Sequence, residues 1–411
     1  MTSAGTNRFR FFYLFYFIAY GAYTAFMNLH FKRLGLSGDE IGRLSALAPL
    51  ATLFVPPLVG AWVDMRWTKR TAVATSLFAS LIVFSLYLTA TSFWPLFAIS
   101  LLFALVNSPL IPLADSATLD HVERSGSHYS QVRVFGSLGF AVGAILAGQV
   151  QQRLGGSSAA GTFLFLYLAA AGLALFVALA FPTESGRRPT AENEKTLTPV
   201  ERFLLPWKTI LQQPALLSFL FALFIARASS VVYYNFFSIY LNELGVAESG
   251  IGITWAVAIA GEVVLMTLAP LLIRRLGSRN VLLLSIIASS ARWGLYSQVD
   301  SHWAIATAQL LHGFTFATLW VAAVTYVNEM TPSRWRASSQ ALLAAVSNGL
   351  APALGVVAAG YLYEQTGKVA PLFGYASLVA LAAGIYLTVY HLLERRSNQR
   401  VRSCSSRPNA P

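Results

Sequence analysis

Cysteine and charged side chains are both scarce in this chain. One of the 411 residues is a cysteine, Cys404, and only 11% of the residues are charged, against about 25% in soluble domains. A lone cysteine excludes a disulfide within the chain, and no Cys/His spacing typical of a metal site occurs. We therefore expect no disulfide framework, no metal and no other cofactor, and the low charge indicates a membrane protein.

Motifs of membrane-embedded enzymes are also missing. The apolar runs contain no His-Glu-x-x-His, no Gly-x-Ser-x-Gly and no paired-aspartate motif. Each of these motifs supplies a metal site or an activated nucleophile. We therefore expect that the protein is not an enzyme.

The formal net charge of +12 does not indicate nucleic-acid binding. The basic residues stand in short clusters between apolar runs and in the C-terminal tail. Such clusters are typical of the loops that set membrane topology. We expect a lipid bilayer, and no nucleic acid, as a partner.

Twelve apolar runs are long enough to cross a bilayer, which takes about 20 mostly apolar residues. A polar stretch divides them into two sets of six. We predict an all-α membrane protein with an N-terminal six-helix bundle at 1–182, a linker at 183–210, a C-terminal six-helix bundle at 211–394 and a tail at 395–411. The predicted spans are 10–31, 42–64, 71–92, 94–120, 130–152, 160–181, 213–241, 250–274, 280–298, 302–330, 337–362 and 370–393.

The basic clusters fall on one side of this twelve-helix topology. The positive-inside rule therefore predicts a multi-pass protein of the cell (inner) membrane with both termini and the linker in the cytoplasm. The clusters are Arg8/Arg10, Arg66/Lys69/Arg70, the linker, Arg274/Arg275/Arg279, Arg334/Arg336 and the tail.

The two halves are related by an internal repeat. "LGLSGDEIG" (34–42) matches "LGVAESGIG" (244–252), and "AILAGQVQQRLG" (144–155) overlays "VVAAGYLYEQTG" (356–367) at nearly the same offset. Six helices repeated in the same sense predict two pseudo-symmetric bundles with a solute site between them near the bilayer midplane.

Two opposite charges fall within consecutive predicted spans, where an ionisable side chain costs about 2.5–3.5 kcal/mol. Asp115 and Arg133 lie on antiparallel neighbours joined by a short turn. They either form a buried ion pair, or Arg133 binds an anionic or hydroxylated solute while Asp115 holds it in place. We favour the second interpretation, with both residues facing a central cavity.

A second group of polar residues lies in the C-terminal half. Glu262, Arg292 and His312 come from neighbouring spans. An acid, a base and an imidazole together predict a proton relay, and Asp115 is a further candidate for proton coupling. The residues of this half that we expect to contact a solute are Tyr233, Tyr234, Asn235 and Arg292.

Two other features are assigned structural roles. We expect Arg227 to snorkel to the cytoplasmic surface. The tyrosines of the first span recur every three or four residues, which favours a packing stripe or an interfacial belt over a cavity lining. They are Tyr13, Tyr16, Tyr20 and Tyr23.

The stretch "GAWVDMRWTKR" (60–70) predicts a conformational gate. Gly60 allows two helices to approach closely, and Asp64 stands at a helix end. The basic residues Arg66, Lys69 and Arg70 anchor the loop. A charge lock between the halves, made in one conformation and broken in the other, explains this combination.

With these motifs the chain resembles the major facilitator superfamily. The pattern at 60–70 is similar to the superfamily's signature between the second and third helices, although the usual glycine after the first basic residue is missing. "SPLIPLADS…YSQVRVFGSLGF", "ARWGLY…QLLHGFTF" and "AGYLYEQTG" have counterparts, in the same order, in the branch that contains lactose permease and the phenylpropionate permeases. The resemblance covers nearly the whole chain except the linker and the tail.

The resemblance implies a secondary transporter that works by alternating access. It places Asp115 and Arg133 at substrate-binding positions, and Glu262, Arg292 and His312 at positions used in binding and proton coupling.

Two departures from lactose permease change the expected proton site. Gln309 stands where that permease has a lysine, and Thr315 stands where it has the carboxylate that loses its proton. If transport is proton-coupled, Glu262 or Asp115 must titrate instead. The nearer likeness to the aromatic-acid permeases favours symport of an aromatic carboxylate such as phenylpropionate.

Several alternatives remain open. A proton-coupled sugar or nucleoside symporter is the main one, and a drug-export antiporter and a transport-dead sensor follow it. A channel is disfavoured because two pseudo-equivalent halves give no ring of filter residues. We expect a monomer whose partners are a small-molecule substrate and protons.

Overall fold

The computed structural model describes residues 3–154, 161–182, 213–332 and 335–405, and the regular structure of this part is entirely helical. The N-terminal half comprises α1 to α7. Its helices are α1 (Ser3–Arg33), α2 (Gly38–Arg66), α3 (Lys69–Ser85) with the short η1 (Leu86–Leu88), α4 (Phe93–Asn107), α5 (Leu110–Ser125), α6 (Tyr129–Leu154) and α7 (Thr162–Leu179).

The C-terminal half repeats this arrangement with more interruptions. Its segments are α9 (Pro214–Glu243), α10 (Glu248–Leu276), α11 (Ser278–Gln298), α12 (His302–Ala308), η2 (Gln309–Leu311), η3 (Gly313–Thr318), α13 (Leu319–Met330), α14 (Arg336–Ala344), η5 (Ala345–Leu350), α15 (Ala351–Thr366) and α16 (Ala370–Ser405).

The twelve predicted spans are present as helical rods. The fourth is formed by α4 and α5, the tenth by α12 to α13, and the eleventh by α14 to α15. Ten rods are long and apolar enough to cross a membrane by themselves. The exceptions, α1 and α11, carry many tyrosine or serine side chains. The last helix continues through the predicted tail as far as Ser405, whereas the predicted linker lies wholly outside the described residues.

The internal repeat is visible as the same turn in both halves. Gly35 and Gly245 adopt positive φ values of 87° and 75° after the first helix of each half. In each turn the following residue donates a backbone hydrogen bond five positions back, Leu36 to Phe31 and Val246 to Leu241. This pattern ends a helix with a glycine in the left-handed backbone conformation. Other residues adopt that conformation only with strain.

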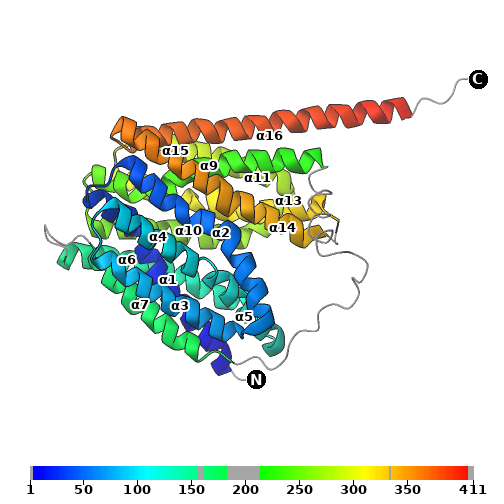
Figure 1. Ribbon diagram of the computed structural model, residues 1–411. Coiled ribbons are helices and arrows are strands. Elements are labelled where there is room, and N and C mark those ends of the chain that lie inside the picture. The colour runs from blue at the N-terminus through cyan, green and yellow to red at the C-terminus, as the bar shows by residue number, and fades with distance from the viewer. Residues whose placement is uncertain (1–2, 155–160, 183–212, 333–334, 406–411) are drawn as a thin grey trace, which may run out of the picture.

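The two halves pack together along two pairs of helices. Helix α6 lies against α10, and α2 lies against α15. Figure 1 shows the halves approaching each other at one end of the bundle and spreading apart toward the end that holds the N-terminus. We call these the closed end, where α1 ends and α2 begins, and the open end, where α1 begins.

Small residues bring the helices together at the closed end. A Cβ atom added to Gly42 of α2 would lie 2.8 Å from the carbonyl oxygen of Val356 in α15, and one added to Gly360 would lie 2.8 Å from Cα of Gly42. Since neither distance is tolerated by a real Cβ atom, these glycines permit the close contact.

Candidate functional site

A cavity of about 530 Å³ lies between the two halves. Helices α1, α2 and α6 line it from the N-terminal half, and α9, α10, η3 and the region of η5 and α15 line it from the C-terminal half. Its wall combines aromatic rings with a small number of polar and charged groups. A volume of this size matches sites for small organic ligands, which occupy about 300–1,000 Å³.

Arg133 is the charged residue that the N-terminal half contributes to the cavity. Its guanidinium lies over the ring of Phe17, 4.4 Å from the centroid, and 5.6 Å from the ring centroid of Tyr13. Aromatic faces attract a cation without occupying its N–H donors. Within the part of the chain that the structure describes, Arg133 forms no ion pair, so its donor fork is available to a solute.

Asp115 does not pair with Arg133 and is not among the residues lining the cavity, which corrects the expectation that both face it. Its Oδ1 accepts hydrogen bonds from the hydroxyls of Tyr13, at 2.5 Å, and Tyr129, at 2.9 Å. Two phenol donors satisfy the carboxylate locally. Because the ring of Tyr13 also contacts Arg133, this tyrosine links the two charges.

Arg292 is fully buried behind the cavity wall rather than in it. Its Nε donates to the hydroxyl of Tyr296 at 3.0 Å, Nη1 donates to Oγ1 of Thr315 at 2.8 Å, and Nη2 donates to Oε1 of Gln309. The ring of Tyr233 lies 4.4 Å from its Cζ. The expected direct contacts of Arg292 and Tyr233 with a solute are therefore wrong for this conformation, because neutral groups and rings enclose the guanidinium.

His312 joins this buried cation to the cavity. Its Nδ1 lies 3.1 Å from Nη1 of Arg292, and its Nε2 lies 3.7 Å from Oε2 of Glu262. A guanidinium can only donate, so Nδ1 accepts and the imidazole proton is on Nε2, directed at the carboxylate. Both His312 and Glu262 line the cavity, so the predicted group of three residues is brought together.

Other expected residues divide between the wall and the core. Tyr234 and Asn235 line the cavity, and their contact with a solute stays a prediction. Tyr20 and Tyr23 of α1 also line it, which corrects the packing-stripe interpretation for these two. Their neighbours on the same stripe, Tyr13 and Tyr16, are not among the lining residues and keep a packing role.

Arg227 is a cavity residue, which corrects the expectation that it snorkels to the surface. It lines the cavity, its Nε donates to the carbonyl oxygen of Ser347 at 3.1 Å, and its Cζ lies 5.9 Å from the ring centroid of Tyr234. Helix α9 begins at Pro214, and thirteen helical residues span about 20 Å. That distance, visible in the sequence, is too long for snorkelling.

Asn28, Trp255 and Asn348 also line the cavity and were missed. Nδ2 of Asn28 donates to the backbone carbonyl of Asn235 at 3.0 Å, across the two halves, and its Oδ1 accepts from Ser45 at 3.2 Å. Lone amide and indole groups in apolar helices give no periodic pattern, so nothing in the sequence distinguished them from packing residues.

The gate motif at 60–70 lies at the open end. A Cβ atom added to Gly60 would meet nothing within 4 Å, so the expected close approach is absent in this conformation. Lys69 forms an ion pair with Asp120 of α5, inside its own half. Arg66 is exposed and Arg70 is half-buried, and the side chain of Asp64 lies outside the described residues. A lock between the halves remains a prediction for another conformation.

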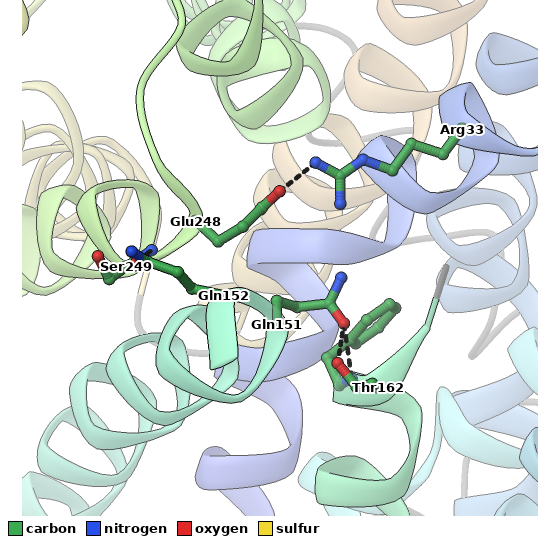
Figure 2. Close-up of polar contacts among 7 residues, drawn as sticks. Arg33, Gln151, Gln152, Thr162, Glu248 and Ser249 are labelled. Atoms are coloured by element: carbon green, nitrogen blue, oxygen red, sulfur yellow. Dashed lines mark hydrogen bonds and ion pairs between the residues drawn. The ribbon is translucent and has the colours of Figure 1, made fainter. Parts of the chain in front are cut away.

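Polar contacts between the halves gather at the closed end. Figure 2 shows Arg33 of α1 reaching Glu248 at the start of α10, with which it forms an ion pair. In the same view, Oε1 of Gln152 accepts a hydrogen bond of 3.2 Å from the backbone N–H of Ser249. The backbone N–H of Gly38 donates to Oε2 of Glu364 at 2.7 Å.

A second charged contact closes the same end. Lys32 of α1 donates to the hydroxyl of Tyr363, which itself donates to Oε1 of Glu243 at 2.9 Å. Among the described residues, the polar contacts between the halves are found at the closed end and at Asn28 of α1. The arrangement is that of a cavity sealed on one side by bonds that are able to separate.

Comparison with known proteins agrees with this architecture. The family model described as "MFS_1 like family" matches residues 7–375. The maltose permease of Geobacillus stearothermophilus is 28% identical over 90% of this chain and 91% of its own length. The protein named "Probable 3-phenylpropionic acid transporter" of Escherichia coli (strain K12) is 28% identical over 90% of this chain and 94% of its own.

A solved structure shares the fold. A crystal structure of a mutant of the nucleoside transporter NupG superposes with a TM-score of 0.83 at 17% identity, over 93% of this chain and 99% of that one. At this identity the likeness concerns the fold alone.

Proposed function

The chain belongs to the MFS_1 like family, and on that premise we propose that it is a proton symporter that imports an aromatic carboxylate by alternating access. That it is a multi-pass membrane transporter of the major facilitator type follows from the family and the fold. The proposal adds the substrate class, the coupling ion and the direction.

The observation that carries the substrate class is Arg133. Its guanidinium lines the cavity and lies against aromatic rings, and it forms no ion pair in the described part of the chain. An unpaired cation among membrane helices is stabilised by an anionic ligand, and its planar fork matches a carboxylate. The neighbouring rings Phe17 and Tyr20 offer an apolar surface to an aromatic group.

Proton coupling is supported by the carboxylate of Glu262. It is the acidic residue among those that line the cavity, and the N–H of His312 is directed at it. A carboxylate that gains a proton from one side and releases it on the other performs symport when the same cycle moves the solute. Asp115, held by two tyrosine hydroxyls away from the cavity, is the less suitable proton carrier.

The basic clusters support an orientation of the protein in the membrane. If the positive-inside rule holds, the open end faces the cytoplasm, and the contacts of Arg33 and Lys32 seal the outer side. For an importer, as proposed, this conformation is the one that releases the solute.

A sugar or nucleoside symporter is the second candidate. The amides of Asn28 and Asn235 lie together in the cavity with the hydroxyl of Ser45, a grouping suited to sugar hydroxyls or base edges. The relative named as a maltose permease accords with it.

Uptake by purified protein in liposomes tests the proposal. Labelled phenylpropionate, maltose and uridine would each be offered with and without an inside-alkaline pH gradient. With the gradient, liposomes that contain the protein are expected to take up phenylpropionate faster than protein-free liposomes, into which the weak acid also diffuses in its neutral form. Gradient-driven accumulation of maltose or uridine, with phenylpropionate uptake no faster than in protein-free liposomes, would replace the substrate class by the second candidate.

A further inference from the structure

The charges around the cavity do not balance. Among the described residues that line it, Arg133 and Arg227 are cationic and Glu262 is acidic, and His312 is held as a neutral imidazole. Neither arginine forms an ion pair within the described ranges. The cavity therefore carries one positive charge more than it carries negative charges.

Arg227 is fixed in place by the backbone rather than by an acid. Its Nε donates to the carbonyl oxygen of Ser347 at 3.1 Å. Ser347 lies in the π-helical segment η5 (Ala345–Leu350), and such segments interrupt the regular bonding of a helix and often occur at functional sites. The bond uses one donor of the guanidinium and leaves its two terminal nitrogens without a carboxylate partner.

We propose that Arg227 is a second anion-binding residue, and that the solute is an aromatic compound with two acidic groups, one bound by Arg133 of the N-terminal half and the other by Arg227 of the C-terminal half. This proposal rests on the proposed function, because it refines the aromatic carboxylate to a dicarboxylate. It gives Arg227 a role that neither the sequence motifs nor the family resemblance assigned.

Charge balance favours a dianion over a monoanion. When Glu262 carries the transported proton, the cavity holds two guanidinium charges and no negative charge. A dicarboxylate neutralises both, whereas a monocarboxylate leaves one guanidinium uncompensated among membrane helices, where an isolated charge is costly. The dianion together with one proton therefore gives a neutral loaded cavity that is able to close around its contents.

The lining of the site is suited to a ring between two charged ends. Arg133 and Arg227 come from opposite halves, and the aromatic side chains Phe17, Trp255 and Phe316 line the same cavity. Rings of this kind pack against an aromatic solute. A solute that is bound by one half through each of its acidic groups bridges the two halves. Only a solute with two charges can then hold the halves together as they close around it.

Equilibrium binding to the purified, full-length protein tests the proposal. The probes are 3-(4-carboxyphenyl)propionate, which has two carboxylates, 3-phenylpropionate, which has one, and uridine. Wild-type protein is expected to bind the diacid about tenfold or more tightly than the monoacid, the usual effect of one additional charged hydrogen-bonded contact.

Arg227→Gln should remove this preference without removing the site. The variant is expected to bind the monoacid within about threefold of wild type, which also shows that it folds, and to lose about tenfold in affinity for the diacid. Arg227→Lys keeps the charge but loses both the Nε that donates to Ser347 and the fork of terminal nitrogens, and should be intermediate. Arg43→Gln, outside the cavity on α2 and paired there with Asp39, is the matched control and should leave both affinities unchanged.

Four results would overturn the proposal. Equal binding of both acids by wild type, or a diacid preference that survives in Arg227→Gln, contradicts the second anion site while leaving the proposed function standing. Loss of both acids in Arg227→Gln shows instead that Arg227 binds the first carboxylate. Binding of uridine and of neither acid by wild type overturns the proposed substrate class and this refinement together.

Discussion

Nη1 of Arg292 lies 3.1 Å from Nδ1 of His312, whose other ring nitrogen lies 3.7 Å from the carboxylate of Glu262. One imidazole thus connects a cation buried in the C-terminal half with an acid that faces the cavity. Because the guanidinium fixes the tautomer, the ring always offers an N–H to the carboxylate. A change of charge on Glu262 therefore alters the electrostatic environment of His312, which contacts Arg292.

Replacing Glu262 by glutamine tests its role as the proton carrier. The amide has nearly the same shape but does not titrate. We expect Glu262→Gln to abolish accumulation driven by a pH gradient and to spare exchange of labelled for unlabelled solute, since exchange requires no net release of protons. Both are measured in liposomes.

Glu394 provides the control for this variant. It lies on α16, beside Arg279, and does not line the cavity. Glu394→Gln should accumulate solute as the wild type does. Accumulation by Glu262→Gln at the wild-type level would show that another group carries the proton.

Arg133→Lys tests the binding of an anion by the N-terminal half. Lysine retains the charge but not the planar fork, and a loss of about 1.5–3 kcal/mol, tenfold or more in Kd, is expected for an aromatic carboxylate. The stability of the protein should change little, because the guanidinium makes ring contacts and no ion pair among the described residues. Titration calorimetry gives the affinity, and an unaltered Kd would assign Arg133 a purely structural role.

The closed end should respond to the charge of Arg33. Arg33→Glu places a carboxylate opposite that of Glu248 and is expected to favour opening on this side. The double variant Arg33→Glu/Glu248→Arg restores the ion pair and should restore the wild-type proportion of molecules that are closed on this side. Spin labels on cysteines introduced on both halves at the closed end would report the distance between the halves. Cys404 is the one native cysteine and would be replaced first.

A matched control for the closed end is Asp39→Asn. Its partner Arg43 is on the same helix, so the substitution removes an ion pair without affecting contacts between the halves. No shift in the distance is expected. If Arg33→Glu also leaves the distance unchanged, the ion pair does not hold this end closed.

Tyr13→Phe separates the two functions of that ring. The variant keeps the aromatic face near Arg133 but removes the hydroxyl that donates to Asp115. We expect stability to fall by about 1–3 kcal/mol, because a partly buried carboxylate loses a partner. Affinity for the solute should stay within about threefold, less than the change that one lost hydrogen bond to the solute would cause. Thermal unfolding in detergent and binding assays measure the two quantities, and the opposite result, weaker binding at equal stability, would return Asp115 to the binding site.

The helices were predictable because a bilayer imposes length and apolarity on every span. The runs at 94–120 and 302–330 were identified as single spans, and each is one rod with an interruption. The interruptions themselves, such as the π-helical segment at Ala345–Leu350, leave no mark in hydropathy. The repeated turn was predictable because Gly35 and Gly245 stand at matching positions of the repeat.

The site was predictable only in part. Glu262 and His312 were found because charge is rare in spans, and the same argument applied to Arg133. It could not tell which charges face a cavity: Asp115 is satisfied by two tyrosine hydroxyls and Arg292 by neutral side chains, contacts between helices that sequence spacing does not encode. Arg227 was misassigned because its depth in the helix was not counted.

The most direct test of the account is whether the solute carries protons with it. Purified protein in liposomes loaded with a pH-sensitive dye would receive 3-phenylpropionate outside, with no initial pH gradient. Proton symport predicts that the lumen of wild-type vesicles acidifies faster than that of protein-free vesicles, into which the weak acid also diffuses in its neutral form, and that Glu262→Gln vesicles acidify no faster than protein-free ones. Faster uptake of the labelled solute by wild-type vesicles, with acidification no faster than in protein-free ones, would contradict proton symport.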